Sequence, residues 1–240
     1  TGQTILSRTL KIFGIGESEM ETRISDIIGS QTNPTIAPYV GAGDISVRVS
    51  ARGRDKSEAD TLMEPVIARI RERLGDYVYS TTGESMEEVV VGLLKKHHVT
   101  VSSAESCTGG MLAAKLVNVP GVSEVFERGF ITYSNRAKIE ELGVSEDILA
   151  ACGAVSRETA VEMAGRLVSK TNTRAGIAVT GIAGPDGGTK EKPVGLVYVA
   201  VILDGDIQCR ELRLVGDRTR IRNISCLNAL DLLRRKLLAL

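Results

Sequence analysis

The stretch Val99-Thr-Val-Ser-Ser-Ala-Glu-Ser-Cys-Thr-Gly-Gly-Met-Leu-Ala-Ala-Lys-Leu-Val117 decides the fold of the larger part of this chain. It begins with a run typical of a strand, passes through a polar turn and two glycines, and ends in a run with helical spacing. Strands and helices continue to alternate after it, as they do in an α/β sheet covered by helices. We therefore expect its hydroxyl side chains at the C-terminal edge of a sheet, where open α/β sheets bind ligands.

The rest of residues 84–240 extends this pattern. The sequence predicts helices at 85–96, 156–171 and 218–240, and strands at 129–134, 175–180, 194–203 and 207–214. The last two strands flank Asp204-Gly-Asp206, which favours a hairpin. We predict an α/β fold for this part, a three-layer α/β/α domain with a mixed sheet.

Residues 1–83 form a separate module that ends at the predicted hinge Thr81-Thr-Gly-Glu84. Strand patterns occur at 9–13, 45–52 and 77–79. A capping box at Ser18-x-x-Glu21 predicts the start of one helix, and a second helix is expected from Ser57 to Gly75. The module is predicted to be a small α+β fold.

Composition and charge exclude several classes of protein. The 240 residues carry 30 basic and 30 acidic side chains, with 42% hydrophobic and only 3% aromatic residues. These values fit a globular protein with a hydrophobic core. Residues 7–80 hold ten basic and eleven acidic side chains and no Gly-x-x-Gly tetrapeptide, so we expect no nucleic-acid partner.

The four cysteines, at 107, 152, 209 and 226, form no Cys-x-x-Cys pair, which favours a reduced, cytoplasmic protein. No apolar run is long enough for a membrane helix, and no secretion signal is visible, so no membrane partner is expected. The chain begins at Thr1 rather than Met, from which we expect a fragment of a longer protein. The two histidines, His97 and His98, lie at a predicted helix end, away from any metal-ligand spacing, so no metal site is expected.

The richest candidate site is Ser102-Ser-Ala-Glu-Ser-Cys-Thr-Gly-Gly110. The amides of Gly109 and Gly110 stand at a predicted helix N-terminus and can donate to an anion, either a phosphate or the oxyanion of a tetrahedral intermediate. The alternative is a capped helix start that needs its glycines only for packing.

A second candidate is Ile131-Thr-Tyr-Ser-Asn-Arg-Ala-Lys138. Lys138 can act as a general base only if burial or another cation lowers its pKa from about 10.4. Tyr133 can relay or orient the proton. The alternative is a solvated lysine at a helix start.

Two further segments suggest ligand binding. Val179-Thr-Gly-Ile-Ala-Gly-Pro-Asp-Gly-Gly188 follows an apolar strand, and its glycines let the backbone approach a ligand closely. Gly216-Asp-Arg218, with Arg220 and Arg222, places arginines near a helix start, where they do not complement the helix dipole. A bound anion would explain them.

These motifs together resemble the C-terminal domain of the CinA competence/damage-inducible protein family. The segments that carry the resemblance are Ala104-Glu-Ser-Cys-Thr-Gly-Gly110, Phe126-Glu-Arg-Gly-Phe-Ile-Thr-Tyr-Ser-Asn135 with Lys138, Gly153-Ala-Val-Ser156, Thr180-Gly-Ile-Ala-Gly-Pro-Asp-Gly-Gly188 and Gly216-Asp-Arg218. The first module, with Leu10-Lys-Ile-Phe-Gly-Ile-Gly-Glu17, is similar to the KH-type module of the same family. Longer members also carry a molybdopterin-binding-like domain, and we expect this chain to be a fragment that does not include it.

The resemblance implies a nicotinamide-mononucleotide deamidase, which releases ammonia from the carboxamide and needs no cofactor. It implies a serine nucleophile at Ser106, a base at Lys138 and its partner at Tyr133, with backbone amides near Thr108 to Gly110 holding the oxyanion. It also implies a homodimer. The residues expected to bind the substrate are Glu105, Thr108, Gly109, Gly110, Thr180, Gly181, Gly184 and Arg218.

Two other functions stay open at this point. The same residues would also suit a non-catalytic module that binds a pyridine nucleotide. A different hydrolase or a phosphoryl-transfer enzyme is disfavoured, because the chain has neither a Gly-x-x-x-x-Gly-Lys-[Ser/Thr] loop nor a dense carboxylate cluster.

Overall fold

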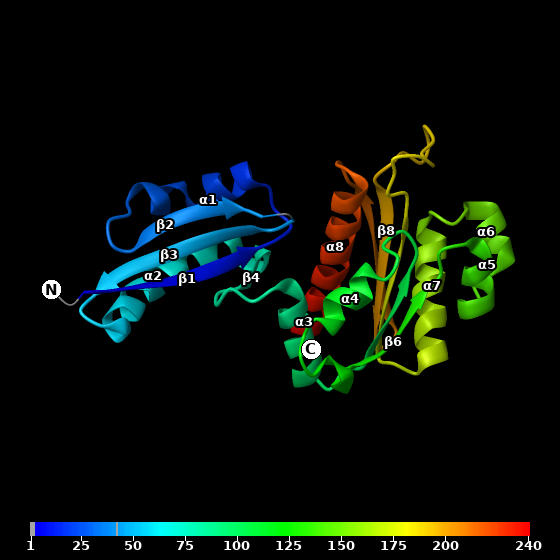
Figure 1. Cartoon of the computed structure of the whole chain (residues 1–240), viewed down its shortest axis with the longest axis horizontal. Coiled ribbons are helices and arrows are strands. Elements are labelled where there is room, and N and C mark those ends of the chain that lie inside the picture. The colour runs from blue at the N-terminus through cyan, green and yellow to red at the C-terminus, as the bar shows by residue number, and fades with distance from the viewer. Residues whose placement is uncertain (1–2, 42) are drawn as a thin grey trace. The chain divides into compact units, whose positions relative to one another are not determined.

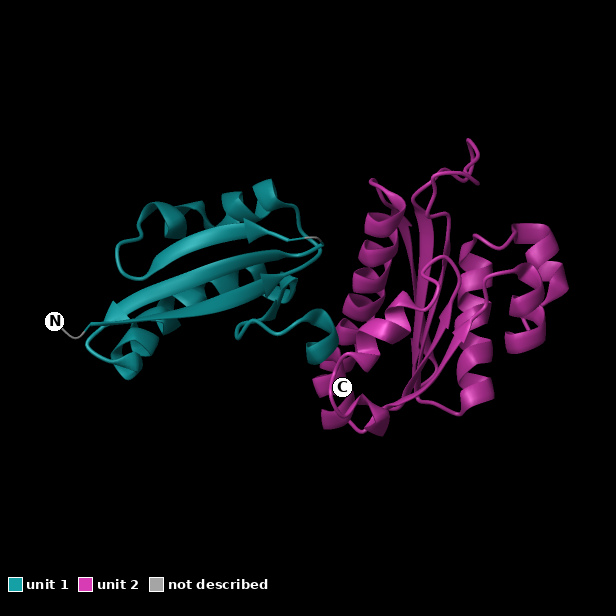
Figure 2. Cartoon of the chain, in the orientation of Figure 1, with its two compact units in different colours: residues 1–89 teal, residues 90–240 magenta. Residues whose placement is uncertain are grey.

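A computed structural model of the chain describes residues 3–41 and 43–240 (Figure 1). The chain divides into two compact units, Thr1–Val89 and Val90–Leu240 (Figure 2). The division falls inside helix α3 (Met86–Lys96), a little beyond the hinge expected at residue 83. A capping box is present at the start of this helix, where the Ser85 and Glu88 side chains each accept the other's backbone N–H.

Unit 1 is an antiparallel sheet with a helix after its first and third strands. Its sheet order is β2-β3-β1-β4, which is the arrangement of a βαββαβ chain. The strands alternate between a face packed on the helices and an open face; in β3, Val47 and Val49 are buried while Arg48 and Arg52 are exposed. The elements are β1 (Thr4–Ile12), α1 (Glu17–Gly29), β2 (Thr35–Val40), β3 (Ile45–Gly53), α2 (Lys56–Leu74), the 3₁₀ turn η1 (Gly75–Tyr77) and β4 (Val78–Ser80).

Three predictions for unit 1 are wrong in detail. The capping box at Ser18 does not form, because α1 already begins at Glu17, after Gly16. Helix α2 begins before Ser57, because the Asp55 side chain accepts the Glu58 N–H at 2.9 Å and caps it. The sequence analysis predicted no strand at 35–40. Half of the residues of β2 are exposed, and its buried and exposed positions do not alternate regularly.

Unit 2 is built on a mixed sheet with the order β6-β5-β7-β8-β9. Strands β6, β5 and β7 run parallel, and β7, β8 and β9 are antiparallel. The hairpin predicted around Gly205 joins β8 and β9. The strands are β5 (Val101–Glu105), β6 (Phe126–Ile131), β7 (Ala175–Gly181), β8 (Leu196–Leu203) and β9 (Asp206–Arg213).

Helices cover both faces of this sheet. Helix α7 (Arg157–Thr171) packs on one face, and α8 (Arg218–Leu238), with α4 (Met111–Val117), packs on the other (Figure 1). Strands β5 and β7 are therefore buried along almost their whole length, as expected for parallel strands covered twice. The predicted three-layer α/β/α fold is confirmed. The shorter elements are α5 (Asn135–Ala137), α6 (Glu146–Cys152), the 3₁₀ turn η2 (Val122–Glu124) and the π-helical turn η3 (Lys138–Leu142).

Two element boundaries differ from the prediction in ways that matter for the site. Helix α4 begins at Met111 rather than Gly109, because Gly109 and Gly110 have φ of 57° and 91° and so remain outside the helix. Strand β6 ends at Ile131, so the residues from Thr132 onwards leave the sheet. Both changes lengthen the loops at the C-terminal edge of the parallel strands.

The turn between β8 and the preceding glycine loop depends on Gly195. This residue has φ of 92°, and a Cβ atom on it would lie 1.9 Å from the Leu214 carbonyl oxygen. Gly195→Ala should lower the free energy of unfolding by more than about 3 kcal/mol, since strained backbone and a steric overlap add together. Urea denaturation measures the loss. The matched control is Gly205→Ala, where φ is 87° but no atom lies within 4 Å of the new Cβ, so a loss of about 1 kcal/mol is expected. Equal losses would contradict the steric argument.

Candidate active site

The candidate site lies where β5 and β6 end side by side. Ser106 follows β5, and its N–H donates to the Val179 carbonyl of β7 at 2.9 Å. Thr132 follows β6, and its N–H donates to the Glu105 carbonyl at 2.8 Å. Since β5, β6 and β7 are parallel, both segments leave the sheet at the same edge. This edge is where an open α/β sheet binds ligands.

Lys138 returns to this edge through a short capped turn. The Ser134 side chain accepts the Ala137 N–H at 3.0 Å, which starts the turn, and Lys138 begins the π-helical segment η3. Only 1% of Lys138 is exposed. Its Nζ donates to Ser106 Oγ at 3.0 Å and to the Thr132 carbonyl at 2.9 Å. The structure thus brings together the serine and lysine that the motifs single out.

The surroundings of Lys138 favour the neutral form of its amine. Burial lowers its pKa from 10.5 to about 8, and the effect of the nearby Cys107 thiol opposes this shift. A neutral amine is therefore accessible close to physiological pH. Ser106 is 8% exposed, compared with 1% for Lys138, so Ser106 is the less deeply buried of the two.

Glu105 organises the turn that carries Ser106. Its carboxylate is fully buried and accepts the N–H groups of Gly110 at 3.0 Å, Leu112 at 3.0 Å and Ala113 at 2.8 Å. It therefore caps α4 from inside. The expectation that Glu105 faces the substrate is corrected: its carboxylate faces the protein.

This cap also corrects the anion site expected at Gly109 and Gly110. The Gly110 amide already donates to Glu105, and the Gly109 amide donates to the Ser106 carbonyl at 3.0 Å. Neither amide is free for an oxyanion. Their left-handed backbone instead turns the chain sharply between Ser106 and α4. A contact of these glycines with substrate stays a prediction.

Thr108 carries a candidate donor beside these amides. In the described part of the chain, its buried hydroxyl has no hydrogen-bond partner. The Thr108 carbonyl accepts Arg222 Nη2 at 2.6 Å, which holds this residue from the other side. Buried polar groups are nearly always paired, so an unpaired donor beside a serine and a lysine is suited to a reacting group.

The Tyr133 hydroxyl contacts Arg218. Tyr133 is 59% exposed, and its hydroxyl accepts Arg218 Nη2 at 3.0 Å. The Lys138 amine reaches Ser106 directly, so the proton needs no relay through Tyr133, and a role of Tyr133 at the site stays a prediction. Arg218 also donates to the Gly184 carbonyl at 2.7 Å. Arg218 therefore joins the loop after β6 to the glycine loop, and it remains exposed to solvent.

Thr180 and Gly181 both make close contacts within the protein, and their contact with substrate stays a prediction. The buried Thr180 hydroxyl donates to the Ala154 carbonyl at 2.7 Å. A Cβ on Gly181 would lie 2.8 Å from the Leu196 carbonyl oxygen, so only glycine allows this approach of β7 to β8. The segment around Gly153 and the glycine loop are thereby held at the same edge.

The arginines of α8 have partners in the protein. Arg218 and Arg222 donate to the backbone of two site loops, and Asp217 caps the helix by accepting the Arg220 N–H at 2.7 Å. The guanidinium contacts of Arg218 and Arg222 explain these two arginines near a helix start without a bound anion. The role of Arg222 in holding Thr108 was missed by the sequence analysis, since Arg222 lies 114 residues further along the chain.

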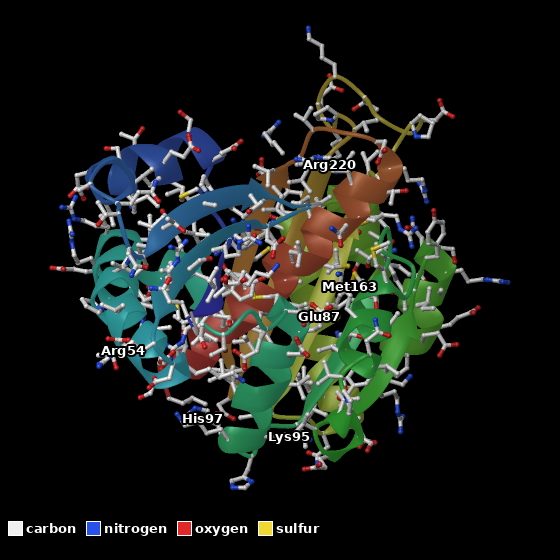
Figure 3. The ribbon with its side chains drawn as sticks, turned by 60° about the vertical axis from the view of Figure 1, so that its left-hand side comes forward. Arg54, Glu87, Lys95, His97, Met163 and Arg220 are labelled. Carbon is white, nitrogen blue, oxygen red and sulfur yellow. The ribbon has the colours of Figure 1, made fainter. Side chains whose placement is uncertain are left out.

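Other nucleophiles and bases are unsuited to this site. Cys107 is 5% exposed, and burial raises the pKa of its thiol to about 12. His97 lies beside Lys95 at the end of α3, and Arg220, which marks the start of α8, lies at the opposite end of unit 2 (Figure 3).

Among residues 3–41 and 43–240, no three His, Cys, Asp or Glu side chains gather as a metal would require. In the same residues, no helix has the length and hydropathy of a membrane span.

Replacing Glu105 by glutamine should destabilise unit 2, because an amide group would face the N–H groups that the carboxylate accepts. We expect the free energy of unfolding to fall by about 3 kcal/mol in urea denaturation. The control is Asp217→Asn, an exposed helix cap in the same unit, where a loss below about 1 kcal/mol is expected. If Glu105→Gln is no more harmful than the control, the buried cap does not hold the turn.

Comparisons with known proteins agree with both units. Residues 83–237 match the model of the CinA C-terminal domain, and residues 7–80 match that of the damage-inducible protein CinA KH domain. A CinA-like protein of Dictyoglomus turgidum is 52% identical over 236 residues, which is 98% of this chain and 57% of that protein. A putative competence-damage inducible protein of Clostridium novyi is 49% identical over 97% of this chain and 56% of its own length. The chain thus spans little more than half of these relatives.

Solved structures match the larger unit. The competence/damage inducible protein CihA from Agrobacterium tumefaciens is 41% identical, with a TM-score of 0.60, over 64% of this chain and 96% of that chain. A CinA superfamily protein from Klebsiella pneumoniae is 31% identical, with a TM-score of 0.63, over 65% of this chain and 97% of that chain. From the motifs, the fold and these matches, the chain belongs to the CinA family of competence/damage-inducible proteins.

Proposed function

We propose that the larger unit hydrolyses the carboxamide of nicotinamide mononucleotide to nicotinic acid mononucleotide and ammonia. The observation that supports an amidase most directly is the contact of Lys138 Nζ with Ser106 Oγ in a buried setting. The choice of substrate rests on the resemblance of the site motifs to the CinA deamidase domain. The homodimer and the cytoplasmic location stay predictions.

The first half of the reaction forms an ester on Ser106. Neutral Lys138 takes the hydroxyl proton, and Ser106 Oγ attacks the carboxamide carbon, which becomes tetrahedral and carries an oxyanion. Lys138 then gives its proton to the nitrogen, the C–N bond breaks, and ammonia leaves. Lys138 is neutral again at the end of this half, and the nicotinoyl group is bonded to Ser106.

The second half releases the acid. Lys138 takes a proton from a water molecule, whose oxygen attacks the ester carbon. Collapse of the second tetrahedral intermediate breaks the bond to Ser106 Oγ, and Lys138 returns the proton to that oxygen. One water is consumed, one ammonia is formed, and the dyad returns to its starting state.

The unpaired Thr108 hydroxyl is the best candidate for oxyanion stabilisation. Thr108 adjoins Ser106 through a tight turn, and its hydroxyl has no partner in the described residues. One such donor is typically worth about 3 kcal/mol in the transition state. Arg222 holds the Thr108 carbonyl and so keeps this segment in place before substrate arrives.

The phosphate of the substrate would be bound by Arg218. This side chain is exposed, sits between Tyr133 and Gly184, and keeps donors available beyond the two it already uses. Its position at the meeting point of two site loops orients the nucleotide relative to Ser106.

Ser106→Ala and Lys138→Met should each lower kcat for ammonia release at least about a thousandfold, because the two groups act as one catalytic unit. Ammonia is measured with nicotinamide mononucleotide as substrate. Cys107→Ala is the matched control and should keep near-wild-type kcat, since its thiol is buried and protonated.

The ammonia assay also tests the alternative of a non-catalytic nucleotide-binding module. That alternative requires the wild-type protein to bind nicotinamide mononucleotide without releasing ammonia. Near-wild-type turnover by Ser106→Ala would exclude the proposed nucleophile. Unfolding should be measured alongside, because removing the buried amine of Lys138 is expected to stabilise the protein at pH 7 by about 1 to 3 kcal/mol.

The reaction should become faster as the pH rises through about 8. Lys138 must be neutral to accept the Ser106 proton, and its pKa of about 8 means that the protonated form predominates below that pH. The logarithm of kcat/KM should therefore rise by about one per pH unit on the acid side and level off above about pH 8. Initial rates over a pH series test this, and a profile that is flat through this region would contradict Lys138 as the base.

A further inference from the structure

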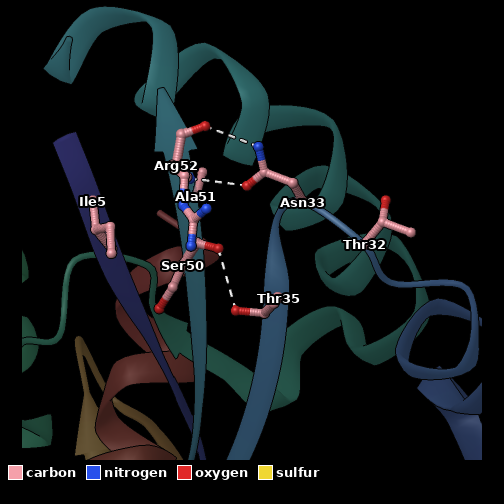
Figure 4. Close-up of a pocket in the computed structure, with 7 residues that line it drawn as sticks. All are labelled: Ile5, Thr32, Asn33, Thr35, Ser50, Ala51 and Arg52. Atoms are coloured by element: carbon pink, nitrogen blue, oxygen red, sulfur yellow. Dashed lines mark hydrogen bonds between the residues drawn. The ribbon is translucent and has the colours of Figure 1, made fainter. Parts of the chain in front are cut away.

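Unit 1 has a groove of its own on the open face of its sheet, with a volume of about 360 Å³ (Figure 4). It lies at the end of the sheet where β3 finishes and β2 begins. The side chains that line it come from all three neighbouring strands and from the loop before β2. They are Ile5, Thr32, Asn33, Thr35, Ser50, Ala51 and Arg52.

The groove is anchored by Asn33. Its side-chain amide donates to the Arg52 carbonyl at 2.8 Å and accepts the Arg52 N–H at 2.9 Å, as the dashed lines in Figure 4 show. The loop is thereby tied to the edge of β3. The position of Arg52 is set before any ligand arrives, while its guanidinium is left out of this pairing.

The guanidinium of Arg52 has no acidic partner among the described residues, whereas the neighbouring arginines Arg8 and Arg54 do. Arg8 binds Asp60 at 2.6 Å, and Arg54 binds Glu58 at 3.0 Å. In the described residues, Arg52 forms no such ion pair, and no carboxylate lines the groove. An exposed arginine without an acidic partner favours an oxyanion as its ligand.

Hydroxyl groups surround this arginine. Ser50 Oγ shares a hydrogen bond of 2.8 Å with Ser7 Oγ, and the Thr35 hydroxyl only approaches the Ser50 carbonyl at 3.4 Å. Thr32 adds another hydroxyl on the loop side. Ile5 forms an apolar wall and is 67% exposed, an unusual degree for an isoleucine in a strand. The groove thus combines donors suited to a phosphate with an apolar surface on which a ring or an aliphatic group can pack.

We propose that this groove binds a small nucleotide through its phosphate monoester, with the phosphate on Arg52 and the hydroxyls and the remainder of the ligand over Ile5. Its volume lies in the range of small-molecule pockets, about 300 to 1,000 Å³. The proposal concerns a second ligand site, on unit 1, and does not depend on the activity proposed for unit 2.

Charge on the same face argues for a free nucleotide rather than a nucleic-acid strand. A strand needs a row of unpaired cations along its backbone. Beyond Arg52, the cations of the open face are already engaged: Arg48 lies over the Tyr39 ring at 4.9 Å, and Lys11 pairs with Asp44 at 3.2 Å. The face therefore offers one phosphate position in the groove.

The test is an amide NMR titration of the full 240-residue chain with adenosine 5′-monophosphate. We expect saturable shifts at Thr32, Thr35 and Arg52, and no such shifts with adenosine, which lacks the phosphate. Arg52→Gln should raise the Kd measured at these amides about tenfold or more, because it removes the charge-assisted bonds. The matched control, Arg71→Gln on the exposed side of α2, should leave the Kd unchanged.

Other outcomes would overturn the proposal. They are shifts confined to residues 90–240, an unchanged Kd in Arg52→Gln, equal binding of adenosine, or tighter binding of a thymidylate oligonucleotide than of the mononucleotide. Ammonia release from nicotinamide mononucleotide should be the same in Arg52→Gln and wild type. The NMR shifts of the unit 1 amides therefore test the groove proposal. Ammonia release tests the deamidase proposal separately.

Discussion

The buried carboxylate of Glu105 is the contact on which the arrangement of the larger unit's site depends. A buried charge is tolerated only when hydrogen bonds replace its water, and the first amides of α4 supply them. The backbone carbonyl of the same residue accepts the Thr132 N–H. One residue therefore ties α4, the turn at Ser106 and the end of β6 together. Ser106 and Lys138, the proposed nucleophile and base, are therefore positioned by contacts within the protein itself.

Burial of the Lys138 amine at this site costs folding free energy. Lowering its pKa from 10.5 to about 8 corresponds to roughly 3 kcal/mol that disfavours the folded protein when the amine is protonated. Because the unfolded chain binds this proton more tightly, the penalty is full below about pH 8 and fades as the pH rises towards the pKa of an unfolded lysine. A polar group held at such a cost is typical of a functional site.

The two units present their ligand-facing groups differently. Unit 2 gathers loops at the edge of a sheet whose faces are both covered, with Arg218 and Arg222 linking the start of α8 to those loops. Unit 1 leaves one face of its sheet uncovered, and the groove beside Arg52 lies on it. Alternation along β3 explains the second arrangement, since every other side chain must point away from the helices.

Hydrophobic periodicity and glycine turns are local properties, so the sequence predicts the α/β class and the order of most elements. The resemblance of the motifs to the CinA family, and not periodicity, implied that Ser106 acts with Lys138. The sequence did not reveal β2, whose residues are half exposed, or the cap of α2 at Asp55. Only the packed structure shows that Glu105 occupies an amide expected to bind an anion, that Tyr133 contacts Arg218, and that the buried Thr108 hydroxyl has no partner in the described residues. These outcomes depend on which polar groups meet across loops distant in sequence, and only the packed sheet edge brings those groups within hydrogen-bonding distance.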